Sequence, residues 1–165
     1  MKKVNYSVII PVYNSEDIVR ETVNRTIQFF SYNNYSFEII LINDGSYDGS
    51  WKIIKGLAKN NTNVVSINLL KNYGQHSAIL CGIHHSKGNY IITLDDDLQN
   101  PPEEIIKLIN KIHEGHDLVF AKFREKKHNS IRKKGSKLIN YFNTKIFNKP
   151  KDLVLTNFRI FSRES

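Results

Sequence analysis

Short apolar runs alternate along this chain with longer segments in which apolar residues recur at helical spacing. The runs at residues 6–12 and 37–42 are rich in β-branched residues, as is typical of strands buried on both faces. Further strands are expected at 63–69, 89–94, 117–121 and 158–161, and helices at 15–30, 50–58, 74–85 and 101–115. Repeated strand–helix units with short loops predict a single α/β domain, with a Rossmann-like, mostly parallel sheet flanked by helices.

Polar residues follow the predicted strands at the points where they end. Tyr13 and Asn14 follow the first strand, Asp44 closely follows the second, and three aspartates follow the fourth. The carboxyl ends of parallel strands meet at one edge of a sheet, and α/β sheets bind their ligands there. Ser15 is expected to cap the helix after the first strand. The sequence therefore predicts a ligand site at this edge.

The aspartates at 95–97 are the strongest chemical signal in the sequence. Adjacent carboxylates repel one another, and a divalent cation relieves that repulsion. In an extended chain Asp95 and Asp97 share one face, and Gln99 can join them, so we expect these three side chains to hold Mg²⁺ or Mn²⁺. The alternative is a solvated acidic turn at the start of the next helix. Asp44 has its own alternative, a simple turn former before Gly45.

Positive charge is concentrated in one segment of the chain. Residues 122–151 contain eleven Lys or Arg and a single acid, so this segment carries +10 of a net charge of +8 and the remainder carries −2. Such a segment suits nucleic acid, anionic lipid or a diphosphate substrate, although a merely solvated basic surface is the alternative.

Composition and missing motifs exclude several classes of protein. A single cysteine, Cys81, excludes a disulfide framework, and the chain has neither a P-loop nor a dinucleotide-binding glycine motif. Phosphate must then be held by a metal and by Lys or Arg. No apolar stretch approaches the roughly 20 residues needed to cross a bilayer, so we expect a soluble domain on the cytoplasmic side.

Three sequence blocks resemble those of family 2 glycosyltransferases with the GT-A fold. They are SVIIPVYN at 7–14, INDGS at 42–46 and LDDDLQNPPE at 94–103. The last block is similar to the polyprenyl-phosphate branch, which includes dolichyl-phosphate mannose synthases and bacterial undecaprenyl-phosphate sugar transferases. NYGQ at 72–75 and FRIFSR at 158–163 match further blocks of that branch. The resemblance spans nearly the whole chain.

The resemblance implies roles for individual residues. The nucleotide would contact Pro11, Val12, Tyr13, Glu16, Ile42, Asp44 and Asp96. The metal would be held by Asp95, Asp97 and Gln99, and the phosphates and acceptor by Arg124, Arg132, Arg159 and Arg163. Asp95, Asp97 and Arg159 would act in catalysis. The chain departs from the family at Ser15, where members usually carry an acid, and at Asn157, where many carry one.

The resemblance also implies an activity. It is a metal-dependent, inverting transfer of a sugar from a UDP- or GDP-sugar to a polyprenyl phosphate, at the cytoplasmic face of an anionic membrane. A phosphate monoester has a second pKa of about 6, so this acceptor arrives already anionic and needs cations more than a base. Members commonly continue into membrane helices, so the catalytic domain at 1–165 is expected to be truncated at its C-terminus.

Two alternatives remain open. If the acceptor is a hydroxyl group of a growing cell-surface glycan, a general base is needed, and Asp152 is the candidate. If the chain binds nucleic acid, the basic segment at 122–151 is explained but the aspartates are not, so no nucleic-acid partner is expected. Assembly into homo-oligomers is left open.

Overall fold

The computed structural model describes residues 4–121 and 156–164. Its contacts divide the chain into two units, of which one comprises residues 1–120 and 157–165 and the other residues 121–156. The strands and helices below all belong to the first unit. The basic segment 122–151, with Arg124 and Arg132, lies outside the described residues, and so does Asp152.

The predicted strands and helices are confirmed, and most of their ends move by only one or two residues. Within the described residues the strands are β1 (Tyr6–Val12), β2 (Phe37–Asn43), β3 (Val64–Asn68), β4 (Tyr90–Thr93), β5 (Leu118–Phe120) and β6 (Arg159–Ser162). The α-helices are α1 (Val19–Tyr32), α2 (Ser50–Asn60), α3 (Gln75–His85) and α4 (Ile105–Ile112), the last preceded by a 3₁₀ turn at Pro102–Glu104.

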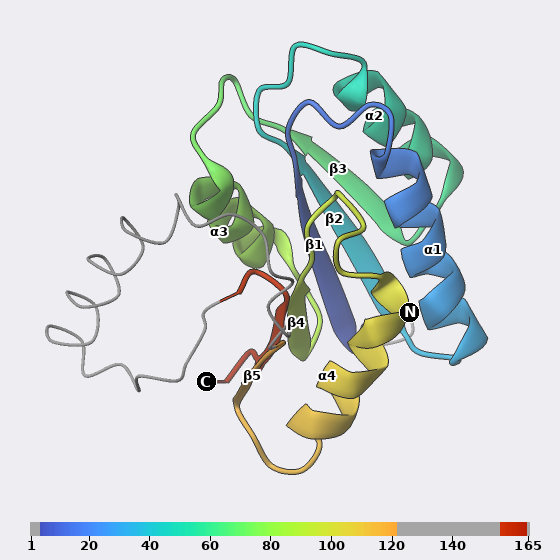
Figure 1. Ribbon diagram of the computed structural model, residues 1–165, viewed down its shortest axis with the longest axis vertical. Helices are drawn as coiled ribbons and strands as arrows, with labels where there is room; N and C mark the ends of the chain where they lie inside the picture. Colours follow the sequence, from blue (N-terminus) through green and yellow to red (C-terminus); the bar gives the residue numbers. More distant parts are fainter. Residues whose placement is uncertain (1–3, 122–155, 165) are drawn as a thin grey trace, which may run out of the picture. The chain divides into compact units, whose positions relative to one another are not determined.

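The strands form one mixed sheet in the order β3-β2-β1-β4-β6-β5 (Figure 1). The first four of these pair in parallel, which confirms the predicted parallel core. β6 runs antiparallel to both of its neighbours, with Arg159 opposite Thr93 and Ser162 opposite Tyr90. β6 therefore begins at the edge of the sheet where β4 ends.

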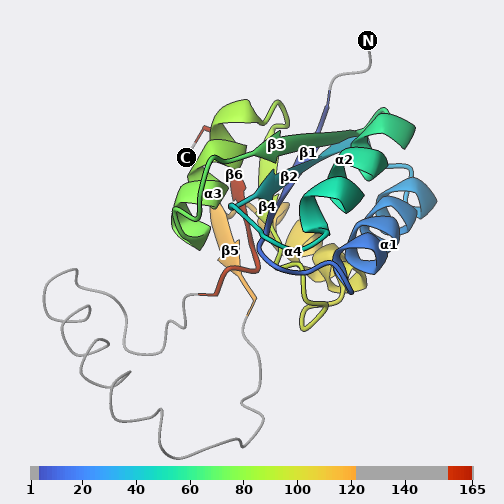
Figure 2. The same ribbon diagram turned by 90° about the horizontal axis from the view of Figure 1, so that it is seen from above.

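Helices cover both faces of this sheet, with α3 on one face and α1, α2 and α4 on the other (Figures 1 and 2). Because side chains alternate between the faces of a strand, Ile9, Ile40 and Ile42 point to the same side and pack against Ala78 of α3. Gly82 brings α3 close to the sheet, since a Cβ there would lie 2.5 Å from the side chain of Ile9.

The first helix begins later than the sequence indicates. The prediction that Ser15 caps it is wrong, because α1 starts at Val19 and Ile18 holds the N-cap position without a side-chain hydrogen bond. The hydroxyl group of Ser15 instead donates to Asp96, 81 residues further along the chain. The Ser15 side chain thus donates to a distant carboxylate instead of accepting from the backbone N–H groups of the helix.

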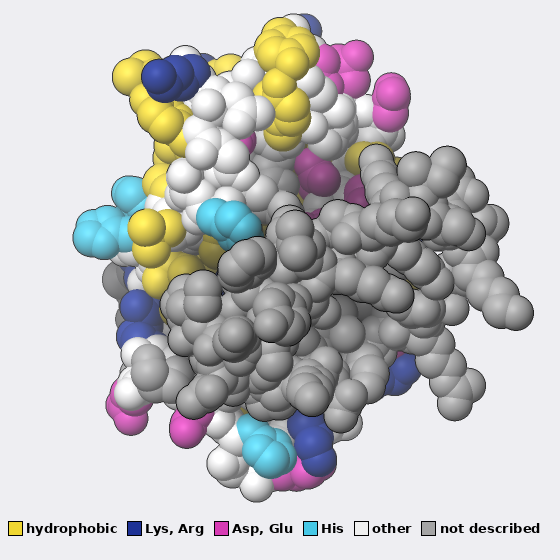
Figure 3. Space-filling view, turned by 60° about the vertical axis from the view of Figure 1, so that its left-hand side comes forward, with side chains coloured by type: hydrophobic (Ala, Val, Ile, Leu, Met, Phe, Trp, Pro, Cys, Tyr) yellow, Lys and Arg dark blue, Asp and Glu magenta, His cyan; other side chains and the backbone are white. Residues whose placement is uncertain are grey.

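The outer surface of α3 combines apolar and histidine side chains (Figure 3). Leu80 is 66% exposed, and His84 and His85 are exposed beside it. The Nδ1 atom of His85 lies 2.8 Å from the carbonyl oxygen of Cys81, which ties the ring to its own helix. No helix in the described ranges has the length and apolar character needed to cross a membrane.

Candidate functional site

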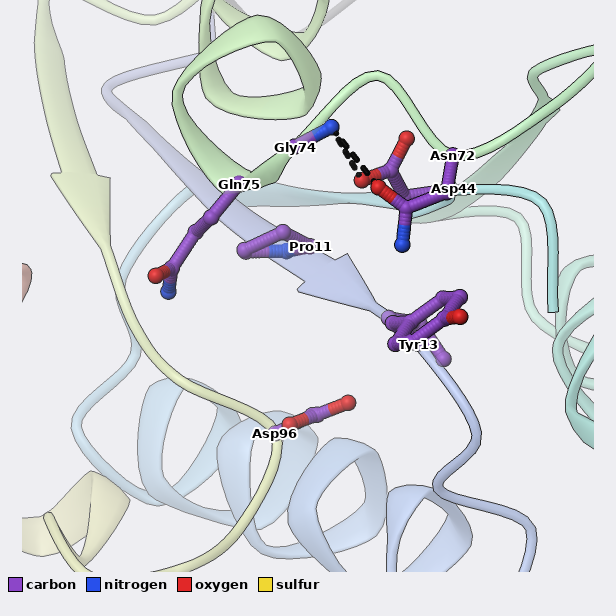
Figure 4. A pocket seen from close by; sticks show the side chains of 8 residues that line it. Pro11, Tyr13, Asp44, Asn72, Gly74, Gln75 and Asp96 are labelled. Carbon is purple, nitrogen blue, oxygen red and sulfur yellow. Dashed lines mark hydrogen bonds between the residues drawn. The ribbon is translucent and has the colours of Figure 1, made fainter.

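A cavity of about 240 Å³ opens at the carboxyl edge of the sheet, beyond the ends of β1, β2 and β4 (Figure 4). Its lining residues are Pro11, Val12, Tyr13, Asp44, Asn72, Gly74, Gln75 and Asp96. The cavity lies where the parallel arrangement predicts a ligand site. Five of the seven residues expected to contact a nucleotide line it, namely Pro11, Val12, Tyr13, Asp44 and Asp96.

Asp44 shapes one wall of this cavity. Its side chain is buried, and its two carboxylate oxygens accept hydrogen bonds from the backbone N–H groups of Tyr73, at 2.8 Å, and Gly74, at 2.9 Å. Gly45 allows these loops to approach because it has a φ of 68° and a Cβ there would lie 2.4 Å from the backbone of Lys71 and Asn72. Asp44 thus fixes the β3–α3 loop over the cavity.

Asp96 forms the opposite wall. Its carboxylate accepts a 2.5 Å hydrogen bond from the hydroxyl group of Ser15, and its carbonyl oxygen accepts one of 2.8 Å from Thr22. Burial raises the pKa of Asp96, and the Ser15 hydroxyl group opposes that rise by stabilising the ionised form. Ser15 therefore holds the central aspartate of the triplet.

Asp95 and Asp97 lie close enough to influence each other. Burial raises the pKa of Asp95, and the negative charge of Asp97 adds to the rise. The Asp95 carboxylate accepts a 2.6 Å hydrogen bond from the side chain of Gln75, and that of Asp97 accepts one of 3.0 Å from the backbone N–H of Gln99. No cluster of three His, Cys, Asp or Glu side chains suited to a metal occurs within the part of the chain that the structure describes.

The loops after β1 and β2 are joined by hydrogen bonds. Asn14 donates its backbone N–H to the Ser46 hydroxyl group at 3.0 Å, and its side-chain oxygen accepts from the backbone N–H of Tyr47 at 3.1 Å. Glu16 is not among the lining residues of the cavity; its carboxylate accepts a 2.5 Å hydrogen bond from Gly49, just before α2. Glu16 is thus placed to hold the loop rather than to line the cavity.

Arg159 stands at the start of β6, at the same edge as Asp95. Its guanidinium group lies over the ring of Phe120, 5.9 Å from the centroid. Its Nε atom is buried and has no hydrogen-bond partner among the residues that the structure describes. A buried donor without a partner is costly, so this atom is suited to an acceptor supplied from outside the protein.

Two residues assigned to the site by resemblance lie elsewhere. Ile42 is fully buried in the core beneath α3, because the alternation along β2 turns its side chain away from the cavity. Arg163 follows the far end of β6 and donates to the carbonyl oxygen of Gly88 and the hydroxyl group of Ser86, both at 2.8 Å. The antiparallel direction of β6 separates it from Arg159, so Arg163 holds the α3–β4 loop.

Three residues that line the cavity were not assigned a role from the sequence. Asn72, Gly74 and Gln75 come from the loop between β3 and α3. The resemblance of the NYGQ block was the available signal. What the sequence lacks is the contact with Asp44 that brings this loop over the strand ends.

Comparison with known proteins gives one consistent family. The model of the family described as "Glycosyl transferase family 2" matches residues 7–164. An undecaprenyl-phosphate 4-deoxy-4-formamido-L-arabinose transferase of Proteus mirabilis is 44% identical over 146 residues, which cover 87% of this chain and 45% of the relative. The protein of the same name from Shewanella sediminis is 46% identical over 135 residues, covering 81% and 41%. The chain thus spans less than half the length of these relatives.

Solved structures support the fold. Glucosyl-3-phosphoglycerate synthase from Mycobacterium tuberculosis, in complex with Mn²⁺, UDP and phosphoglyceric acid, aligns with a TM-score of 0.72 at 20% identity, covering 98% of this chain and 56% of that one. A mannosyltransferase from Pyrobaculum calidifontis, in complex with GDP-Man and Mn²⁺, aligns with a TM-score of 0.69 at 14% identity, covering 99% and 46%. The sheet described above is that of GT-A glycosyltransferases.

Proposed function

Because the chain belongs to glycosyl transferase family 2, we propose that it carries the donor-binding part of an enzyme that transfers a sugar from a nucleotide diphosphate to undecaprenyl phosphate. The observation that carries the proposal is the cavity at the carboxyl edge, which is lined by Tyr13 and Asp44 and, from the aspartate triplet, by Asp96. An aromatic ring, buried polar groups and a cluster of hard oxygen atoms suit the base, the ribose and the diphosphate respectively.

Divalent metal chemistry fits the donor atoms at this edge. Asp95 and Asp97 offer carboxylate oxygens that repel one another, and Gln99 offers an amide oxygen. A bound Mg²⁺ or Mn²⁺ would neutralise charge on the departing diphosphate. Both structural relatives named above contain Mn²⁺. Asp96, held by Ser15, keeps the backbone of the triplet in place beside this group of ligands.

The acceptor side of the proposal depends on Arg159. A phosphate monoester already carries negative charge near neutral pH, so it requires a cation rather than a base. Arg159 has a buried Nε atom without a partner among the described residues and lies at the edge where β4 delivers Asp95. We therefore assign the binding of the acceptor phosphate to Arg159. We also propose that the transfer inverts the configuration at the anomeric carbon. The relatives' names include undecaprenyl phosphate, which supports this choice of lipid and a membrane surface as the place of reaction.

Donor and metal binding are tested by calorimetric titration with UDP and with GDP, each with and without Mn²⁺. We expect one nucleotide to bind more tightly with Mn²⁺, and Asp97→Ala to remove the metal-dependent gain. Asp117→Ala is the matched control, because Asp117 is an exposed aspartate just before β5, at the opposite edge. If neither nucleotide binds under any condition, the proposal is wrong.

The acceptor is tested by incubating the protein with a radiolabelled nucleotide sugar and, in parallel reactions, with undecaprenyl phosphate or a cell-surface glycan. We expect a lipid-linked sugar phosphate whose anomeric configuration is opposite to that of the donor. Transfer only to a glycan hydroxyl group would favour the alternative acceptor. Arg159→Lys should lower transfer to the lipid while leaving nucleotide binding intact, because Lys keeps the charge but lacks the Nε donor.

A further inference from the structure

A pair of tyrosines stands at the mouth of the cavity. Tyr13 lines the cavity at the end of β1 and is 38% exposed, whereas Tyr47, in the loop between β2 and α2, is 82% exposed. The ring centroids are 5.6 Å apart, the rings meet edge to face at 83°, and the two hydroxyl groups are hydrogen-bonded. Tyr47 therefore touches a cavity residue although it does not line the cavity itself.

The backbone beneath this pair is fixed by the hydrogen bonds between the two loops. Asn14, directly after Tyr13, bonds to both Ser46 and the backbone N–H of Tyr47. The two rings are thus carried by loops that hold each other in register. The pKa of Tyr13 is raised, first because of its hydrogen bond to Tyr47, and the pKa of Tyr47 is lowered by the same bond.

Folding alone gives little reason for Tyr47 to adopt this position. A side chain that is 82% exposed buries little apolar area, so burial alone does not explain why Tyr47 lies against Tyr13. The contact does restrict the ring of Tyr13, which at 38% exposure would otherwise sample several rotamers. The contact with Tyr47 therefore sets the orientation of the Tyr13 ring at the entrance of the cavity.

We propose that Tyr47 is a positioning residue for the nucleobase of the donor, because it holds the Tyr13 ring at the angle that receives a planar heteroaromatic base. This inference rests on the proposed function and adds to it a residue outside the cavity. Asp44, whose carboxylate oxygens both accept hydrogen bonds from the β3–α3 loop, forms the wall beside this ring. The base would then contact a ring that is already oriented. Because less conformational entropy is lost on binding, this pre-orientation increases the affinity for the nucleotide.

The test compares ligands that contain a base with one that does not. Tyr47→Ala and Tyr47→Phe are titrated, in the presence of Mn²⁺, with the nucleoside diphosphate that the unmodified protein prefers and with pyrophosphate. We expect Tyr47→Ala to weaken nucleotide binding about two- to tenfold, the range of one aromatic pair, and to leave pyrophosphate binding within about twofold. Tyr47→Phe keeps the ring contact but lacks the hydroxyl group, so its affinity for the nucleotide should lie between those of Tyr47→Ala and the unmodified protein.

Tyr32→Ala is the matched control. Tyr32 is 88% exposed at the end of α1, so the substitution removes an equally exposed tyrosine away from the cavity. It should change neither affinity. Equal nucleotide binding by the Tyr47→Ala and unmodified proteins would overturn the inference, as would an equal loss for nucleotide and pyrophosphate. If the unmodified protein binds pyrophosphate but no nucleotide, the proposed function fails first, and this inference fails with it.

Discussion

The close approach of Gly45 to the β3–α3 loop gives the sharpest test of how the cavity is built. Gly45 has a φ of 68°, and an added Cβ would lie 2.4 Å from the backbone N of Asn72 and from the carbonyl carbon of Lys71. Non-bonded carbon contacts are comfortable at about 3.5 Å, so in Gly45→Ala this loop must move by about 1 Å. The left-handed φ adds roughly 1 kcal/mol of strain for alanine.

The same movement breaks the contacts of Asp44. The bonds from Tyr73 and Gly74 to its carboxylate, now 2.8 and 2.9 Å, would stretch by about 1 Å beyond hydrogen-bonding range. Each bond to a charged acceptor contributes about 1.5–3 kcal/mol, of which the relaxed loop recovers part. We expect Gly45→Ala to lower the free energy of unfolding by about 3–4 kcal/mol and the Tm by roughly 10 °C.

Urea denaturation of both proteins measures this difference, and nucleotide titration shows whether the cavity survives. Gly56→Ala is the matched control, because Gly56 lies inside α2 with nothing within 4 Å of the added Cβ. It should raise the free energy of unfolding by about 0.5–1 kcal/mol, as alanine does for a helical glycine. The reasoning is refuted if Gly45→Ala unfolds within about 1 kcal/mol of the unmodified protein, or if both variants lose stability alike.

Two further substitutions test contacts away from the cavity. Asn34 follows the end of α1 with a φ of 55°, and the backbone N–H of Tyr35 donates back to the carbonyl oxygen of Phe30. Because glycine adopts this left-handed conformation without strain, Asn34→Gly should raise the free energy of unfolding by about 0.5 kcal/mol. Asn34→Ala should lower it by about 1 kcal/mol, and urea denaturation measures both changes. The hydrogen bond from Arg25 lowers the pKa of Glu103 in the folded protein below its value in the unfolded chain. The ionised Glu103 therefore stabilises the fold above about pH 4.3, and this contribution is lost as the pH falls. Since the Arg25–Glu103 pair is largely exposed, Glu103→Gln should lower the free energy of unfolding by at most about 1 kcal/mol at pH 7 and by nothing near pH 2. Thermal melts of both proteins at the two pH values measure this, and an equal difference in Tm at both would contradict it.

The order of the elements could be predicted because each signal is local. Residues 6–12 form a continuous apolar run whose length and β-branched content indicate a buried strand, and β1 has those bounds. The carboxyl-edge location of Tyr13, Asp44 and Asp96 follows from the parallel arrangement alone, without any knowledge of side-chain contacts.

The errors arose where a distant partner decides the outcome. Serine is a residue type typical of helix caps, but Asp96 offers the Ser15 hydroxyl group a partly buried acceptor that no local pattern reveals. Arg159 and Arg163 stand four residues apart in one sequence block, and only the antiparallel pairing of β6 shows that they belong to opposite edges of the sheet. A strand of four residues carries no signal of its own direction in the sheet.

The acids at the carboxyl edge divide into two kinds, which explains why the sequence contains more of them than a metal needs. Asp44 and Asp96 direct their carboxylates at protein donors, the N–H groups of Tyr73 and Gly74 in one case and the Ser15 hydroxyl group in the other. Their charge is used to hold loops together. Among the described residues, Asp97 accepts only the backbone N–H of Gln99, two residues further on, and it is exposed, so its charge remains available to a ligand. Asp95 also directs its carboxylate at a protein donor, the side chain of Gln75. The aspartate triplet thus serves two purposes, since Asp96 anchors the turn to Ser15 while Asp97 remains available to a ligand.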